Sequence, residues 1–130
     1  MVIATVEDAP TKRLARARLE SPSGLVVDLI ASTSGIEHEI VSRSTLVRLD
    51  GMGLLPVARA EELLAMKVLS MTDRRLQDRI DARNLVRCSA DLDREAVRDD
   101  VALIEARGFA RGQDLQAKLA GVLEDAGRDD

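Results

Sequence analysis

Four charged side chains stand where the pattern calls for apolar residues, and they are this chain's candidates for chemistry. Lys67 lies on the apolar stripe of a helix predicted over residues 60–71. An unpaired ammonium is costly to bury, so Lys67 either extends along apolar surface to water or binds an anion. The next predicted helix, over 74–85, presents Asp78 and Asp81 three residues apart on one face. A cation on one helix and two carboxylates on the next predict an ion pair or part of an anion site.

The fourth residue, Asp28, interrupts the apolar run of residues 25–31. That run is typical of a strand buried on both faces, where a carboxylate must be paired, hydrogen-bonded or metal-bound. A structural ion pair with Arg16 or Arg18 on the preceding strand is the alternative to a metal ligand. For the two aspartates of the helix, the alternative is a local salt bridge to an arginine such as Arg74.

Composition limits the classes of protein that fit. With 130 residues, 45% apolar and 32% charged, the chain is long enough for one domain with a modest core. One Phe and no Tyr or Trp exclude single-stranded nucleic-acid binding by base stacking, and the net charge of −4 provides no basic field for nucleic acid or membrane. A single cysteine, Cys88, expected in the core, and a single histidine, His38, expected in solvent, exclude disulfides and Cys- or His-rich metal sites. We expect a cytoplasmic, bacterial protein without a membrane partner.

The elements that must position these residues follow from periodicity and turn chemistry. Strands are predicted over 2–6, 12–20, 25–31, 45–49 and 54–58, and helices over 36–42 (with Ser34 as N-cap), 60–71, 74–85, 92–107 and 113–126. The predicted fold class is α+β: a small, mostly antiparallel sheet of three to five strands, followed by and packed against about four helices. We expect one domain over 1–130, with a sheet part over 1–58 and a helical part over 59–127.

Three segments in this order resemble a known family. They are VVDLI, LPVARAEELLAMKV and RRLQDRIDARNLV. Together they look like the C-terminal part of the nucleotidyltransferase-like family related to the AbiEii type of toxin, from toxin–antitoxin systems, in the DNA polymerase β-like superfamily. The resemblance extends from about Leu14 to the end of the helical part.

The resemblance implies a role for each of the four residues. Asp28 matches the metal-side acid on a central strand, and Lys67 matches the lysine that contacts the nucleotide phosphates. Asp78 and Asp81 match the paired acids that support that lysine. The implied cofactors are Mg²⁺ and a nucleoside triphosphate, since nucleotidyl transfer uses acids to hold metal and a cation to balance phosphate charge.

One departure from the family changes the expected function. The family's N-terminal half carries a Gly-Ser segment followed by an Asp-x-Asp pair on a strand, and no such segment precedes Asp28 here. We therefore expect a truncated, catalytically incomplete relative that acts as a binding or interaction module and forms a homo-oligomer through an exposed sheet edge. The alternatives are an active enzyme completed by a partner chain, with nucleic acid only as substrate, and a purely structural α+β oligomer in which Lys67 pairs internally.

Overall fold

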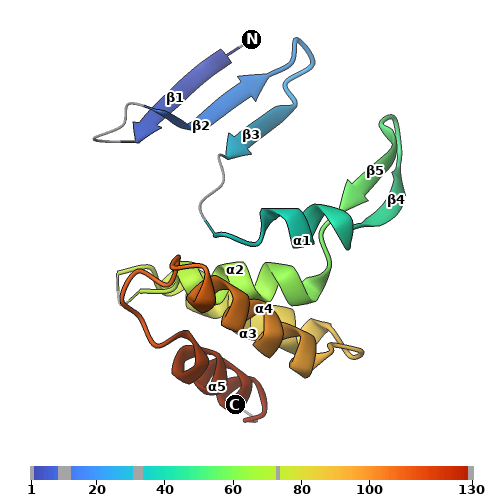
Figure 1. Cartoon of the computed structure of the whole chain (residues 1–130). Helices are drawn as coiled ribbons and strands as arrows, with labels where there is room; N and C mark the ends of the chain where they lie inside the picture. Colours follow the sequence, from blue (N-terminus) through green and yellow to red (C-terminus); the bar gives the residue numbers. More distant parts are fainter. Residues whose placement is uncertain (1, 9–12, 31–33, 73, 129–130) are drawn as a thin grey trace. The chain divides into compact units, whose positions relative to one another are not determined.

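The structure is a computed structural model of the chain, and it describes residues 2–8, 13–30, 34–72 and 74–128 (Figure 1). The chain divides into two compact units, Met1–Thr33 and Ser34–Asp130. The division falls within the predicted sheet part rather than at 58/59, because the strands after Ser34 belong to the same unit as the helices.

The first unit is a three-stranded antiparallel sheet. Its strands are β1 (Val2–Asp8), β2 (Arg13–Glu20) and β3 (Val26–Ile30), in the order β1-β2-β3. The turn between β2 and β3 closes with a 2.9 Å hydrogen bond from Ser21 N to Leu25 O. Gly24 in this turn has a φ of 87°, which glycine adopts without strain.

The prediction that β3 is buried on both faces is wrong for this unit. β3 pairs with β2 on one side only within the unit, and the apolar side chains around Asp28 are between 40% and 53% exposed. Continuous apolar sequence is typical of a central parallel strand. Here the same pattern occurs on a strand at the edge of a three-stranded sheet.

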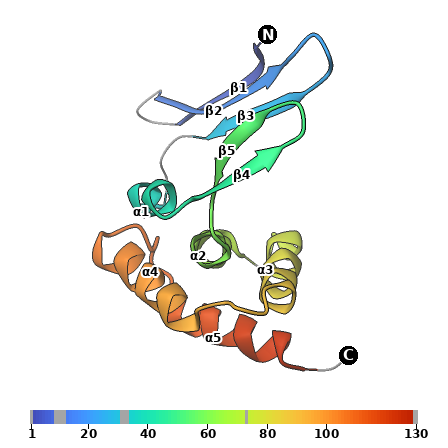
Figure 2. The same cartoon turned by 90° about the vertical axis from the view of Figure 1, so that its right-hand side faces the viewer.

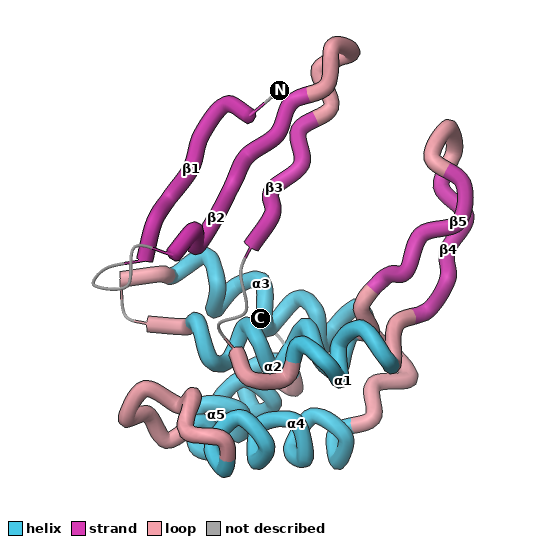
Figure 3. The backbone as a smooth tube through the Cα atoms, turned by 45° about the horizontal axis from the view of Figure 1, so that its top comes forward, coloured by secondary structure: helices cyan, strands magenta, loops and turns pink. Residues whose placement is uncertain are grey.

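The second unit contains a hairpin and the five helices of the described residues. Its elements are α1 (Glu37–Ser42), β4 (Thr45–Leu49), β5 (Gly53–Val57), α2 (Ala60–Ser70), α3 (Leu76–Cys88), α4 (Arg94–Ala106) and α5 (Leu115–Ala126). The α+β class is confirmed. The prediction of a single sheet is wrong, because β4 and β5 form a separate two-stranded sheet. Within the described chain, no helix makes more than a marginal contact with these two strands. Figure 3 shows this hairpin projecting from the helices.

Helix α2 lies at the centre of the helical part, and Figure 2 looks along it with the other helices around it. The core is aliphatic, as the composition predicts, and includes Leu64, Val68, Val101, Ile104 and Leu119. On α2, Leu63 is 38% exposed, whereas its neighbour Glu62 is fully buried. At 3.6 residues per turn, Leu63 lies on the side of α2 opposite the buried face.

The residues that lead into α1 are fixed in place by contacts with the chain's one Phe and by an ion pair. Phe109 packs on Gly35, where a Cβ would come within 2.5 Å of the ring. Arg107 donates from Nη1 to the Gly35 carbonyl at 2.6 Å and from Nη2 to Glu39 Oε1 at 2.6 Å. The hydrogen bond from Arg107 lowers the pKa of Glu39 to about 2. The predicted N-cap is two residues off, since Ile36 occupies that position while Ser34 hydrogen-bonds to Glu37.

We expect Gly35→Ala to lower the free energy of unfolding by about 2 kcal/mol, because it combines a left-handed φ of 80° with the clash on Phe109. Gly108 is the matched control: its φ is 82°, but nothing lies within 4 Å of an added Cβ. Gly108→Ala should therefore lose only about 1 kcal/mol. Urea unfolding of both variants measures the difference, and equal losses would show that the Phe109 contact adds nothing.

Within the described residues, no helix has the length and apolar character needed to span a membrane. Cys88, expected in the core, is exposed because it is the last residue of α3 and lies beyond that helix's buried positions. His38 is exposed, as predicted.

Candidate functional site

Lys67 on α2 donates to both predicted aspartates on α3. Its Nζ lies 3.2 Å from Asp78 Oδ1 and 3.1 Å from Asp81 Oδ2. The two helices pack against each other, and the Lys67 side chain is 37% exposed at the edge of their contact. Burial opposes the charge of the ammonium, but the hydrogen bonds to Asp81 and Asp78 outweigh it and raise the pKa of Lys67. The structure therefore brings three of the four predicted residues together and keeps the lysine charged.

The two aspartates differ in their surroundings. The Asp78 side chain is only 7% exposed, and Arg75 Nε approaches its Oδ2 to 2.8 Å. That oxygen nevertheless accepts no well-directed hydrogen bond from the described residues. Arg75 therefore stabilises the Asp78 carboxylate mainly through its positive charge and less through a hydrogen bond. The local partner is thus Arg75, three residues away, rather than the predicted Arg74. Asp81 is 38% exposed, and the hydrogen bond from Gln77, followed by that from Lys67, lowers the pKa of Asp81.

Asp28 belongs to the first unit and forms the alternative ion pair predicted for it. Arg18 faces it across the β2–β3 ladder, with Nε 2.8 Å from Asp28 Oδ1 and Nη2 3.1 Å from Oδ2. The hydrogen bond and the charge of Asp28 raise the pKa of Arg18. Both carboxylate oxygens therefore bind a guanidinium in this arrangement.

Acidic side chains are also the candidates for holding a metal ion. Among the described residues no group of three or more His, Cys, Asp or Glu side chains is arranged to hold one. The Asp-x-Asp triplet at residues 91–93 instead begins α4, where Asp93 Oδ1 accepts a hydrogen bond from Ala96 N at 3.1 Å. This is a helix N-cap, so the triplet has a structural role.

Sequence reasoning missed a second cluster, which is more deeply buried than Lys67. Glu62 on α2 and Asp100 on α4 are both fully buried. Arg59 Nε donates to Glu62 Oε1 at 2.7 Å, and Arg43 Nη1 donates to Asp100 Oδ1 at 2.8 Å. The same Arg43 nitrogen lies 4.0 Å from Glu62 Oε2. One guanidinium thus spans two carboxyl groups that come from different helices.

The two buried acids titrate as a pair. Burial, and then the hydrogen bond and charge of Glu62, raise the pKa of Asp100 to about 7, while Arg43 acts against this shift. Burial opposes ionisation of Glu62 too, but hydrogen bonds from Arg59 and Asp100 lower the pKa of Glu62. Asp100 Oδ2 accepts no hydrogen bond from the described residues. A proton on Asp100, donated to Glu62, would satisfy both groups, so the raised pKa of Asp100 favours sharing of one proton between the two acids.

The sequence contained one signal for this cluster. Glu62, Ala65 and Leu69 recur at helical spacing, which places Glu62 on a buried stripe of α2.

No family model matches this chain, and no curated protein matches it. The resemblance to nucleotidyltransferases therefore stands on the three sequence segments alone.

Proposed function

We propose that this chain is a nucleotidyltransferase-like binding module in which Lys67 contacts the phosphates of a nucleoside triphosphate. One observation carries the proposal: the Lys67 ammonium is fixed by Asp78 and Asp81 at a partly exposed position and keeps its charge. A cation held in place loses little freedom when an anion binds, so less of the interaction energy is lost to ordering. The family resemblance assigns this lysine to phosphate contact and the two aspartates to the support of the lysine.

The charge balance of this site sets a limit on affinity. The two positive charges of Lys67 and Arg75 balance the two negative charges of Asp78 and Asp81, so these four side chains together carry no net charge. A triphosphate must therefore compete with Asp81, the more exposed acid, for the ammonium. This favours binding of the magnesium complex, whose net charge is lower than that of the free triphosphate.

Catalysis requires more acids than this site provides. Asp28 is the metal-side acid in the proposal, and it would have to exchange its Arg18 partner for a metal ion. An active enzyme that transfers a nucleoside monophosphate therefore needs carboxylates from another segment or from a partner chain. Among the described residues no group of three or more acids or other metal ligands is arranged to hold a metal ion, so the activity proposed for this chain alone is binding rather than transfer.

A structural role is the second candidate, and the burial of Asp78 favours it. A carboxylate that is 7% exposed needs a counter-ion whether or not a ligand exists, and Lys67 supplies one. In that case the lysine fastens α2 to α3 and binds nothing else.

The proposal includes a homo-oligomer in the cytoplasm, formed through a sheet edge. Within the first unit β3 has one strand partner, and its apolar side chains Leu25, Val26, Val27 and Leu29 are at least 40% exposed. Unpaired edges with apolar side chains favour strand pairing with another copy. Sedimentation at micromolar concentration tests this part, and a monomeric mass would contradict it.

Calorimetric titration with each of the four nucleoside triphosphates in magnesium tests the main proposal. We expect saturable binding by the wild-type chain and a loss of at least about tenfold in affinity for Lys67→Met. Arg98→Gln, which removes an exposed cation of α4 that pairs with Glu95, is the matched control and should bind like the wild type. If none of the triphosphates binds, or if both variants weaken binding equally, the nucleotide role is wrong and the structural one holds.

A further inference from the structure

A different group of cations lines a cavity at the end of α2. The cavity has a volume of about 400 Å³ and is lined by Met71, Thr72, Arg79, Gln113 and Lys118. These residues come from the C-terminal end of α2, from α3, and from the start of α5. Neither Lys67 nor its two aspartates belong to this lining. The volume is within the range of small-molecule sites.

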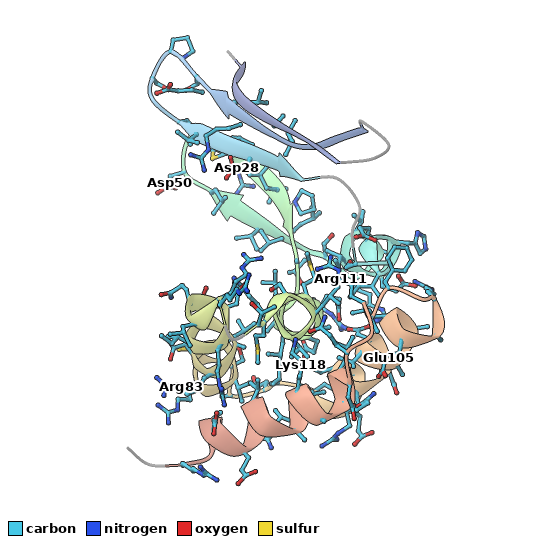
Figure 4. All side chains as sticks on the ribbon, turned by 90° about the vertical axis from the view of Figure 1, so that its left-hand side faces the viewer. Asp28, Asp50, Arg83, Glu105, Arg111 and Lys118 are labelled. Carbon is cyan, nitrogen blue, oxygen red and sulfur yellow. The ribbon has the colours of Figure 1, made fainter. Side chains whose placement is uncertain are left out.

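Lys118 is held rigidly at this cavity. Its Nζ donates to Met71 O at 2.5 Å and to Gln113 Oε1 at 2.6 Å. The Gln113 amide nitrogen in turn donates to the carbonyls of Leu69 at 3.3 Å and Ala110 at 3.2 Å, which fixes the oxygen toward the lysine. Figure 4 shows Lys118 reaching from α5 toward α2. An ammonium has three N–H groups, so one is left for a ligand.

The charge of Lys118 has no counter-ion among the described residues. Its two partners are neutral oxygens, and no carboxylate of the described chain lies within ion-pair distance of it. Burial, and then the charge of Arg111 on the preceding loop, lower the pKa of Lys118. Both effects oppose the ammonium, and an anion in the cavity would reverse them.

A second cation stands at the same cavity. Arg79 is 60% exposed, and Asp125, with which it pairs at 3.3 Å, is itself 34% exposed. Such an exposed pair contributes little to stability, so the guanidinium can turn to a better acceptor at small cost. Thr72 adds a hydroxyl on the same wall. The cavity thus offers the forked N–H donors of Arg79, the fixed ammonium of Lys118 and the hydroxyl of Thr72. Together these donors match the several oxygens of a phosphate group.

We propose that the Met71–Lys118 cavity is a phosphate-binding site for a small phosphorylated ligand. Lys118 is the fixed contact, Arg79 closes on a second phosphate oxygen, and Gln113 positions the lysine. The apolar side chain of Met71 borders the space left for the rest of the ligand. The same contacts serve free phosphate or a phosphomonoester, because both offer the same oxygens.

Titration of the isotope-labelled full chain with inorganic phosphate, followed by amide NMR, tests the proposal. We expect saturable shifts at Thr72 and Gln113, which chloride at equal ionic strength does not produce. Arg79→Gln should weaken binding at least about fivefold, whereas Arg98→Gln on α4 should not. Lys118→Gln should abolish the shifts. Since this variant also removes the hydrogen bond to Met71, Arg79→Gln is the variant that separates binding from folding.

A parallel titration with phenyl phosphate distinguishes the two sources of the phosphate group. Binding at least about tenfold tighter than inorganic phosphate identifies a phosphomonoester, and equal binding identifies the free anion. The site would be overturned by shifts that do not saturate, by shifts that spread over exposed arginines of other helices, or by an affinity for phosphate that is unchanged in Arg79→Gln.

Discussion

Asp100→Asn is expected to stabilise the protein above pH 7 by about 2 to 4 kcal/mol and to remove most of the pH dependence of unfolding between pH 5 and 8. An asparagine in this position keeps an oxygen for Arg43 and offers an N–H to Glu62, as a protonated Asp100 does. It therefore reproduces the neutral form of the buried acid at every pH.

The sign of this effect follows from the direction of the shift. The pKa of Asp100 is raised from 3.8 to about 7 in the folded chain. Because folding raises this pKa, the contribution of Asp100 to the free energy of unfolding is fully present below the pKa of the carboxyl group in the unfolded chain. That contribution is lost as the pH rises through about 7. The wild-type chain should therefore unfold more readily at pH 8 than at pH 5.5, and Asp100→Asn should gain more at pH 8 than at pH 5.5.

Urea unfolding at pH 5.5 and pH 8 measures both quantities. Asp99→Asn is the matched control, because Asp99 is the neighbouring residue of α4 and is exposed. It removes the same charge without touching Glu62 or Arg43. A gain in Asp99→Asn as large as that in Asp100→Asn would assign the effect to net charge, and a flat wild-type profile would show that the pair holds no shared proton.

The sequence predicted the elements well because their signals are local. Helical spacing, the Ser21–Gly24 turn and the alternation in β2 are properties of neighbouring residues, and the observed bounds differ from the predicted ones by a few residues. The Lys67 pair was predictable for a related reason. A short turn joins α2 to α3, so a lysine on one helix and acids on the next must lie close together.

The buried acid pair could not be predicted in the same way. Arg43 and Asp100 are 57 positions apart, and nothing local distinguishes a fully buried Asp100 from the exposed Asp99 beside it. Whether a carboxyl group is buried depends on which helix packs over it, and that is set by the tertiary fold. The exposure of β3 has a similar origin, because its apolar pattern does not say whether a strand is central or at an edge.

Lys67→Met is expected to lower the free energy of unfolding by about 2 to 3 kcal/mol, because it leaves the buried Asp78 without its hydrogen-bonded counter-ion. Arg75 remains close to Asp78 Oδ2, but it is 63% exposed and makes no well-directed hydrogen bond there. Loss of the bond to Asp81 should matter less, since Asp81 is 38% exposed and keeps Gln77 as a donor.

A double-mutant cycle separates the lysine from the acid. Asp78→Asn removes the buried charge, so adding it to Lys67→Met should restore most of the stability that Lys67→Met loses. Asp81→Asn in the same background should restore little. Thermal and urea unfolding of the four chains give the coupling energy, and a coupling near zero for Asp78 would mean that the ion pair does not fasten α2 to α3. Lys67 would then be free for phosphate, and its affinity for a nucleoside triphosphate would rise in Asp81→Asn, which removes the acid competing for the ammonium.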